Sequence, residues 1–453
     1  MKRTRQGRCR WAARPAIVFG IVAGIISLPC AGAAWSAGLL EPATSLDMQA
    51  AAAQPAPMGN LAVRSRLMRV NRTELARHVA PLGIDTAPDR VARAQNLDGV
   101  VTLQLFPNVV ATFKRTSLDT IGDSGYAWTG EIDGPLNFAS LIVDDGQITG
   151  HIQLLHHLYK IEPLGNGVHR VSEIDAKRFP PEAKPVPLRK SLAPTVAPGA
   201  NDLRTQEPRA KTQIRILVAY TKKARNQNAN IINDIKQAIQ LANTAFNNTK
   251  IPIRFVLAAI MSARTYPEAG GGSTGFSNDL NNLNGSNGSV LANVRNKRNA
   301  VQADLVSLFR SSDNDICGIA NHLDNLSAGT SNVAYSVLNW QCVSNLSFHH
   351  EAGHNMSLRH DYYVDPVKGR GYNHGYVNIA NKCRIRTVMG YNNACVDKKG
   401  FNCTRVNVFS TAKFVWKIGN TNCAIGIAKD GLKKAADNTQ RLKEVRTIVG
   451  NYR

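Results

Sequence analysis

Cysteine is missing from most of this sequence: none lies between Cys30 and Cys317, and no two cysteines form a CxxC pair. The missing pairs argue against a zinc site built from cysteines, because such sites usually use closely spaced pairs. A long hydrophobic run is also missing, since the most apolar stretch covers only residues 16–28. A stretch of that length is shorter than a permanent membrane-spanning helix needs, so we expect no permanent membrane span.

Acidic residues are absent from the first 37 residues, which contain six lysines and arginines. These cations lie between Lys2 and Arg14, the apolar run follows, and small residues come next in CAGAAWSA. This order is typical of a secretory signal peptide, which we place at residues 1–36. The alternative is an N-terminal signal anchor. We therefore expect a secreted protein, either extracellular or periplasmic.

The cysteines that remain after the signal segment all lie in the last third of the chain: Cys317, Cys342, Cys383, Cys395, Cys403 and Cys423. An even number in an exported protein predicts three disulfides, for which fifteen pairings are possible. Free buried thiols or a cysteine metal site are the alternative.

The positive charge is unevenly distributed in a chain of 453 residues with a formal net charge of +23. Residues 213–453 contain 30 Lys or Arg against 14 Asp or Glu, whereas residues 38–212 contain 19 against 18. A basic domain attracts anionic partners, such as acidic polypeptides, nucleic acid or bacterial surface polymers. Because the cations are scattered, solubility is an equal explanation, and we expect no specific nucleic-acid partner.

Composition divides the exported chain into three parts. Residues 37–176 contain short stretches rich in β-branched and aromatic residues, which predict a small β-rich domain with strands at 99–106, 125–132, 138–143 and 150–162. Residues 177–212 are rich in proline and have no apolar periodicity, so they are expected to form an extended linker.

Strand and helix patterns alternate within residues 213–453 and predict an α/β fold. Strands are expected in the stretches 213–221, 251–260, 303–309 and 333–340. A helix is expected over 231–248, with a buried face formed by Ile232, Ile235, Ile239, Ala242 and Phe246. A second helix follows a possible cap at Asp437, with Leu442, Val445 and Val449 on one face.

Four histidines lie within the stretch HHEAGHNMSLRHD, residues 349–361. On a helix, His350 and His354 lie one turn apart on the same face, close enough to share one metal ion. Glu351 lies beside the first ligand and can act as the general base for a water molecule. His360 is six residues further on, so the chain must turn back for it to complete a three-histidine site with one open position.

This stretch and the later RTVMGYN resemble the HExxHxxGxxH motif and the Met-turn of the metzincin zinc peptidases, most closely the reprolysin-like branch. More narrowly, ILVAYT, CGIA, HGY and the late ADN with Arg441 are similar to the bacterial peptidyl-Asp metalloendopeptidases. The resemblance implies a metzincin-like catalytic domain with a twisted mixed sheet, preceded by a β-rich propeptide. It also implies one Zn²⁺, with Met389 as the floor beneath the histidines. Ser357 departs from the family motif, which has a glycine where the chain turns.

The resemblance further implies a zymogen whose active form cleaves polypeptides before Asp or Glu. Tyr391 is a possible zinc or oxyanion ligand, and Arg384 and Arg386 are candidates for binding an acidic substrate side chain. His349 is expected to be a neighbour rather than a ligand, and His374 an exposed loop residue. The propeptide has no cysteine, so a cysteine switch is excluded. We expect a monomer. The alternative function is a catalytically impaired, zinc-stabilised basic adhesin or binding module.

Overall fold

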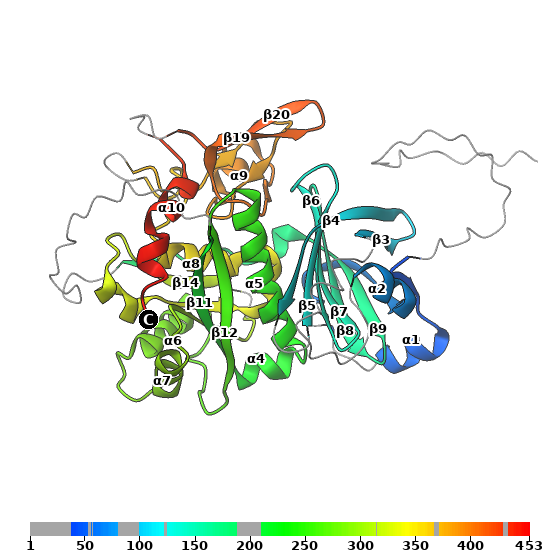
Figure 1. The fold of residues 1–453 in the computed structure, drawn as a ribbon, viewed down its shortest axis with the longest axis horizontal. Coiled ribbons are helices and arrows are strands. Elements are labelled where there is room, and N and C mark those ends of the chain that lie inside the picture. The colour runs from blue at the N-terminus through cyan, green and yellow to red at the C-terminus, as the bar shows by residue number, and fades with distance from the viewer. Residues whose placement is uncertain are drawn as a thin grey trace, which may run out of the picture.

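The computed structural model describes residues 38–52, 56, 58–79, 99–121, 125–187, 210–313, 315–366, 371–428 and 434–453. The signal peptide expected at residues 1–36 lies outside these ranges. The described chain forms two large sheets on either side of one long helix, with the N-terminal sheet on the right of Figure 1 and the C-terminal part on the left.

The N-terminal sheet has nine strands in the order β1-β2-β9-β8-β7-β6-β5-β4-β3, and every neighbouring pair with a described register is antiparallel. Its strands are β1 (Leu40–Pro42), β2 (Ala62–Val70), β3 (Val100–Phe106), β4 (Val109–Ile121), β5 (Gly125–Glu131), β6 (Asn137–Asp144), β7 (Gln147–Leu154), β8 (His157–Gly165) and β9 (Val168–Ile174). Two short helices, α1 (Ser45–Ala52) and α2 (Arg72–His78), accompany the sheet.

Most strands expected in this part of the sequence are confirmed, as β3, β5 and β6 show. The expectation of one strand over 150–162 is wrong, because the stretch contains the end of β7 and the start of β8. The turn between them includes Leu155 at a φ of 51°. Neither Gly nor Asn marks that turn, so the residue types there did not predict it.

The C-terminal part contains a six-stranded mixed sheet in the order β10-β14-β15-β13-β11-β12. Strands β12, β11, β13 and β15 are parallel to one another, β14 is antiparallel to β15, and β10 is parallel to β14. The strands are β10 (Val186–Pro187), β11 (Thr212–Thr221), β12 (Ile253–Ala263), β13 (Leu305–Arg310), β14 (Gly318–His322) and β15 (Tyr335–Asn339). The strands expected from 213 to 340 are therefore confirmed, and β14 is the additional one.

The helices of this part are α4 (Lys222–Gln227), α5 (Ile231–Asn248), α6 (Gly272–Asn284), α7 (Ala292–Ala300), α8 (Ser347–Asn355), α9 (Asn393–Lys399) and α10 (Asn438–Val449). Short 3₁₀ helices cover Ala176–Arg178 (η1), Ala328–Val333 (η3) and Trp340–Asn345 (η4). Helix α5 has the predicted bounds, and the side chain of Asp437 caps α10 by accepting from Gln440 N at 3.0 Å. Ile232 was wrongly placed on the buried face of α5, since it is 36% exposed and Ile231 is buried instead.

Helix α5 lies between the two sheets, packed on β12 on one side and on β5, β6 and β7 on the other (Figure 1). The contact with the N-terminal sheet includes ion pairs. Lys160 of β8 pairs with Asp234 of α5, both side chains being almost fully buried. Lys236 of α5 lies 2.6 Å from Asp144 of β6. The contact is also apolar, because Phe138 and Ile142 of β6 belong to the same buried hydrophobic cluster as Ile235 of α5.

Three disulfides join residues of the C-terminal part: Cys317–Cys342, Cys383–Cys423 and Cys395–Cys403. The expectation of three disulfides is confirmed, and free thiols at these positions are excluded. Two small sheets follow the histidine cluster: β16 (Val377–Asn378), β17 (Ile385–Arg386) and β18 (Thr404–Arg405) form one, and β19 (Thr411–Ile418) and β20 (Thr421–Ile425) form the other. Cys383–Cys423 links the two sheets, and Cys395–Cys403 links α9 to the start of β18.

The proline-rich range 177–212 is described at residues 177–187 and 210–212. Its first part runs along β14. Cys317 N donates to Pro181 O at 2.8 Å, and Ala183 N donates to Gly318 O at 3.0 Å. Strand β10 then pairs with Asn321 and His322. This segment therefore covers the edge of the six-stranded sheet that β14 would otherwise expose.

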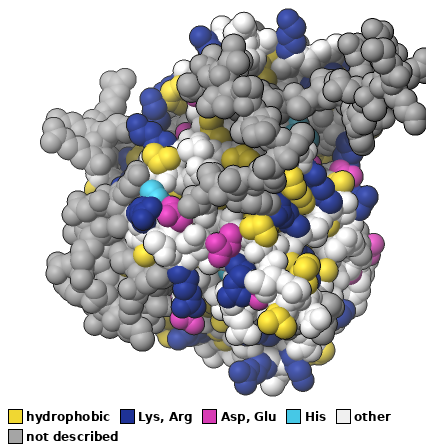
Figure 2. All heavy atoms as spheres, turned by 90° about the vertical axis from the view of Figure 1, so that its right-hand side faces the viewer, with side chains coloured by type: hydrophobic (Ala, Val, Ile, Leu, Met, Phe, Trp, Pro, Cys, Tyr) yellow, Lys and Arg dark blue, Asp and Glu magenta, His cyan; other side chains and the backbone are white. Residues whose placement is uncertain are grey.

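Lysine and arginine side chains are interspersed with acidic and apolar ones on the face seen in Figure 2, which is the right-hand side of Figure 1. This face belongs to the side of the molecule with the N-terminal sheet, where the sequence is nearly balanced in charge. Among the described residues, no helix is long and apolar enough to cross a membrane.

Candidate active site

Helix α8 positions the first two histidines of the cluster. It begins after Leu346, which has a φ of 63°, and it is buried along its whole length against β14, β15 and α5. His350 and His354 lie one turn apart on it, with ring centroids separated by 4.9 Å. The helix ends at Asn355, and the chain turns back at Ser357.

Ser357 takes the backbone conformation that the motif glycine would adopt, with a φ of 70°. Its hydroxyl donates to Asp324 O at 3.2 Å and accepts from Arg441 Nη2 at 3.0 Å. These hydrogen bonds offset the cost of placing a serine in the left-handed region, which is about 1 kcal/mol. The substitution therefore leaves the turn intact, and His360 reaches the other two histidines.

Ser357→Gly removes the backbone strain of a serine at positive φ, but it also removes the hydrogen bonds of the serine hydroxyl. These two effects oppose each other, so the variant is expected to change the free energy of unfolding by less than about 1 kcal/mol. Ser357→Ala keeps the positive φ and loses the Arg441 contact, so it is expected to destabilise by about 1 kcal/mol or more. Urea unfolding of the full chains measures both. A Ser357→Gly chain that is stabilised by more than about 2 kcal/mol would show that the serine hydroxyl contributes nothing.

The three histidines converge through their Nε2 atoms. His360 Nε2 lies 3.1 Å from His350 Nε2 and 3.0 Å from His354 Nε2. The Nδ1 atoms of the two helical histidines face backbone carbonyls at 2.9 Å, those of Val388 and Leu358. Nδ1 of each therefore carries the proton, and the lone pair of each Nε2 points toward the centre of the cluster.

This donor set fits a tetrahedral zinc ion. Burial lowers the pKa of His354 to about 3 and lowers the pKa values of His350 and His360 well below the usual range, so all three imidazoles are neutral ligands. Three nitrogens at Zn–N distances of ~2.0–2.1 Å would lie about 3.3 Å apart, close to the observed separations. Three ligands leave one tetrahedral position open, which is the arrangement of catalytic rather than structural zinc sites.

Glu351 lies next to His350 and is only 1% exposed. Neither of its carboxylate oxygens has a hydrogen-bond donor among the described residues. A Cβ added at Gly318 of β14 would lie 2.7 Å from Glu351 Cγ, so only glycine lets the strand pass this close. Burial, followed by the neighbouring charge of Glu182, raises the pKa of Glu351 well above its usual range.

Met389 lies beneath helix α8. It is fully buried, and a Cβ added at Gly353 would lie 2.8 Å from its sulfur, so the helix and the Met-turn are in close contact. The preceding Val388 supplies the carbonyl that orients His350. Met389 thus packs beneath the helix that carries His350 and His354.

Tyr391 is the next candidate from the Met-turn, and its ring centroid lies 4.1 Å from that of His360. Its backbone N donates to Asp361 Oδ2 at 2.8 Å, which ties the Met-turn to the end of the histidine motif. Its hydroxyl donates to Glu182 O at 2.9 Å and to Ala183 O at 3.1 Å, so it contacts the proline-rich segment that covers the site.

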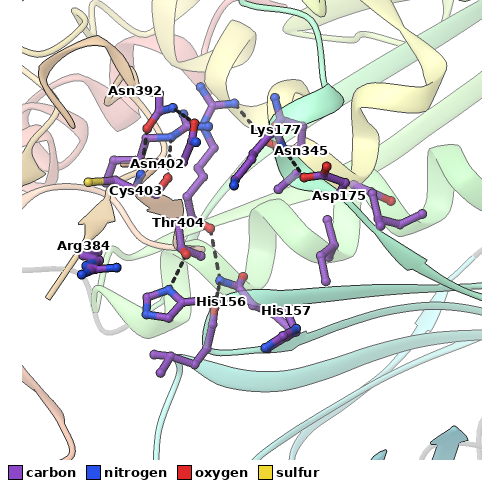
Figure 3. A pocket seen from close by; sticks show the side chains of 18 of the residues that line it. His156, His157, Asp175, Lys177, Asn345, Arg384, Asn392, Asn402, Cys403 and Thr404 are labelled. Atoms are coloured by element: carbon purple, nitrogen blue, oxygen red, sulfur yellow. Dashed lines mark hydrogen bonds between the residues drawn. The ribbon is translucent and has the colours of Figure 1, made fainter. Parts of the chain in front are cut away.

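The two candidate arginines bind backbone carbonyls. Arg384 Nε donates to Asn381 O at 2.9 Å, and its guanidinium stacks on Phe401. Arg386 Nη1 donates to Gly390 O at 2.8 Å, and burial lowers its pKa well below the usual range. Both line a cavity of 490 Å³ between the segment 400–405 and the β7–β8 turn, where His156 contacts Thr404 (Figure 3).

The remaining histidines of the motif region are buried. His349 faces away from the cluster and contacts Asn407 Oδ1 at 2.9 Å, so it is a neighbour rather than a member of the three-histidine group. The expectation that His374 is an exposed loop residue is wrong, because its side chain is fully buried. Its Nδ1 lies 2.6 Å from His360 O, and its ring stacks on Tyr362 at 3.8 Å. His374 therefore supports the turn that carries His360.

Two charged residues of the site were not predicted. Glu182 and Arg405 form an ion pair of 2.5 Å beside Glu351, with both side chains almost fully buried. They are 223 residues apart in the sequence. In the sequence, Glu182 stands out only as one acidic residue among the prolines of FPPEAKPVP, residues 179–187, and that stretch predicts a linker. Nothing in the sequence marks Arg405.

Comparison with known proteins agrees with this geometry. Residues 232–361 match the family described as metallo-peptidase family M12B, reprolysin-like. The chain is similar to a peptidyl-Asp metalloendopeptidase of Stenotrophomonas maltophilia, with 26% identity over 95% of this chain and 97% of the relative. A protein of the same name from Xanthomonas campestris is 27% identical over 95% of this chain and 98% of the relative.

Among solved structures, metalloproteinase-II from Bacteroides fragilis aligns with a TM-score of 0.37 and 12% identity over 58% of this chain and 81% of that chain, a similarity too weak to support any conclusion. The family match ends at Asp361, immediately after the third histidine, and the relatives match nearly the whole chain. The family match and the two relatives together support a reprolysin-like metallopeptidase.

Proposed function

We propose that this chain is an exported zinc endopeptidase, made as a zymogen, that hydrolyses peptide bonds with Glu351 as the general base. The observation that carries the proposal is the convergence of three histidine Nε2 atoms beside a buried carboxylate that has no hydrogen-bond donor of its own. His350, His354 and His360 would hold one Zn²⁺. When bound, zinc acts as a Lewis acid that polarises the substrate carbonyl and makes water a nucleophile at neutral pH.

Glu351 supplies the proton transfers in this proposal. Its carboxylate accepts a proton from the attacking water and later delivers it to the leaving amine, so the residue ends each cycle unchanged. Its burial excludes bulk water and holds the carboxylate on one side of the histidine cluster. Met389 and Val388 fix the ligands from below, and the two Nδ1 hydrogen bonds fix the tautomers of His350 and His354.

The zymogen proposal is supported by the segment 179–187. It pairs with β14, the edge strand beside the site, where an extended substrate would otherwise add as a further strand. The segment follows β9 of the N-terminal sheet along the chain, and that sheet packs on α5 of the C-terminal part. Residues 37–176 would thus be a propeptide domain, residues 213–453 the catalytic domain, and maturation would remove the propeptide with the range 177–212.

The alternative, an impaired adhesin or binding module, rested on Ser357. The serine adopts the required φ and the three histidines still converge, so that reason no longer holds. The disulfides are consistent with an oxidising compartment.

The preference we propose is for Asp or Glu after the scissile bond. It is supported by the name of the two relatives and by the excess of 16 cations over acids in residues 213–453. Cleavage products of casein, mapped by mass spectrometry, are expected to begin mostly with Asp or Glu, and cleavage should slow as added salt screens the attraction. A map dominated by large apolar residues after the cut would contradict the preference and leave the zinc mechanism standing.

A further inference from the structure

Arg405 holds Glu182, the one acidic side chain in the described part of the proline-rich segment. Arg405 Nη1 lies 2.5 Å from Glu182 Oε1, and Ser347 Oγ donates to the same oxygen at 2.6 Å. The two charged side chains are only 4% and 2% exposed. Arg405 Nη1 also donates to Asn345 O at 2.9 Å, which fixes the guanidinium at the start of helix α8. We call Arg405, Ser347 and Asn345 the Arg405 pocket.

The Arg405 pocket has no acid of its own. Among the described residues, Glu182 is the only carboxylate within ion-pair distance of Arg405, and Arg405 Nε has no acceptor. If residues 179–187 leave, Arg405 loses the ion pair with Glu182 and its guanidinium faces the space that the Glu182 carboxylate occupied. A guanidinium held in place by Asn345 O forms charge-assisted hydrogen bonds best with a carboxylate, so the pocket favours a ligand that returns one.

The pocket lies where a side chain next to the cleaved bond would lie. Glu182 O accepts from Tyr391, whose ring contacts that of His360, and Glu182 Oε1 accepts from Ser347, four residues before Glu351 on helix α8. The acidic side chain thus reaches Arg405, whose Nη2 lies 3.4 Å from His350 Nδ1, while its backbone carbonyl accepts from Tyr391.

The rival cations are less well placed. Arg384 and Arg386 donate to backbone carbonyls and form no ion pair with a described carboxylate. Figure 3 shows Arg384 on the opposite side of the cavity from Asn345, the residue whose carbonyl binds Arg405. A substrate carboxylate that took the place of Glu182 would therefore meet Arg405 and not Arg384.

We propose that Arg405 is the residue that recognises the acidic side chain of a substrate, and that Glu182 occupies its pocket in the uncut chain as an internal substitute. The inference rests on the proposed peptidase function and names the specificity residue of that site. It also gives the zymogen a latency device in place of a cysteine: the segment contributes its own acidic side chain and blocks substrate until it is removed.

The first test compares chains that have matured from the full-length protein: wild type, Arg405→Met, Arg405→Lys and, as the rival, Arg384→Met. Each acts on two peptides that differ only in Glu or Gln after the scissile bond. The wild-type ratio of kcat/KM for Glu over Gln is expected to fall by at least about 30-fold in Arg405→Met. Arg405→Lys, which retains the cation, should recover part of the ratio, and Arg384→Met should keep it.

The second test uses full-length chains that also carry Glu351→Gln, which prevents self-processing. Glu182→Gln and Arg405→Met are each expected to lower the midpoint of thermal unfolding, and the double variant should fall by clearly less than the sum, because the two side chains are coupled. Glu173→Gln, which alters a glutamate within the N-terminal sheet, serves as the control and should add to Arg405→Met without coupling.

The results of these tests distinguish an error in the role of Arg405 from an error in the proposed peptidase function. Peptide hydrolysis with an acidic preference that Arg405→Met leaves unchanged would overturn the inference and leave the peptidase function intact. Strictly additive effects of Glu182→Gln and Arg405→Met would overturn the claim that Glu182 occupies the pocket. Hydrolysis of neither peptide by any matured chain would overturn the proposed function and the inference together.

Discussion

Glu351→Gln should give a folded chain that binds zinc normally and has lost almost all peptidase activity. The amide cannot accept the proton of the attacking water, whereas the three ligands are untouched, so the loss is expected to be in kcat and to be about 100- to 10,000-fold. Initial rates on a quenched peptide, together with the zinc content of the same sample, measure the effect.

Glu444→Gln is the matched control, since it removes a carboxylate of helix α10 that lies outside the histidine cluster. It should keep both zinc and activity. A Glu351→Gln chain that retains activity within tenfold of wild type would refute the assignment of the general base. A chain that loses zinc as well as activity would show that Glu351 supports the ligands rather than the proton transfer.

The histidine cluster could be predicted because the interaction is local. On one helix, a spacing of four residues places His350 and His354 on the same face, and the return of His360 needs only a single turn at Ser357. Helix α5 was predicted for a similar reason, since its apolar face repeats at helical spacing. The first residue of that apolar face was predicted wrongly as Ile232. Ile231 and Ile232 are both apolar, and only the packing shows that Ile231 faces the core.

The Arg405 pocket and its occupant Glu182 could not be predicted, because they come from distant parts of the sequence. Glu182 belongs to a proline-rich segment without periodicity, and Arg405 is one of 30 cations in the C-terminal part. Only the fold brings the two together, through the pairing of β10 with β14 and the return of β18 to the start of α8. The disulfide pairing depends on the same topology, as does the burial of His374.

Removal of the metal is the second change expected to have a large effect. Three neutral imidazoles whose lone pairs converge at about 3 Å repel each other when no cation lies between them. A chelator should therefore abolish peptidase activity and lower the midpoint of thermal unfolding, because the metal binds the folded state. Zn²⁺ added back should restore both.

His360→Ala removes one ligand and should leave a chain that Zn²⁺ cannot reactivate, with zinc occupancy well below one per chain. His157→Ala, an exposed histidine of β8, is the matched control and should retain one zinc. Full zinc occupancy in the His360→Ala chain would mean that the third ligand has been assigned to the wrong residue.

The most direct single measurement follows zinc content and peptide hydrolysis in one matured wild-type sample through chelation and reconstitution. We predict one zinc per chain and active hydrolysis at the start, neither after chelation, and recovery of both in proportion when Zn²⁺ is returned. Hydrolysis that persists after the metal has gone, or a fully zinc-loaded matured chain that cleaves no peptide, would contradict the account.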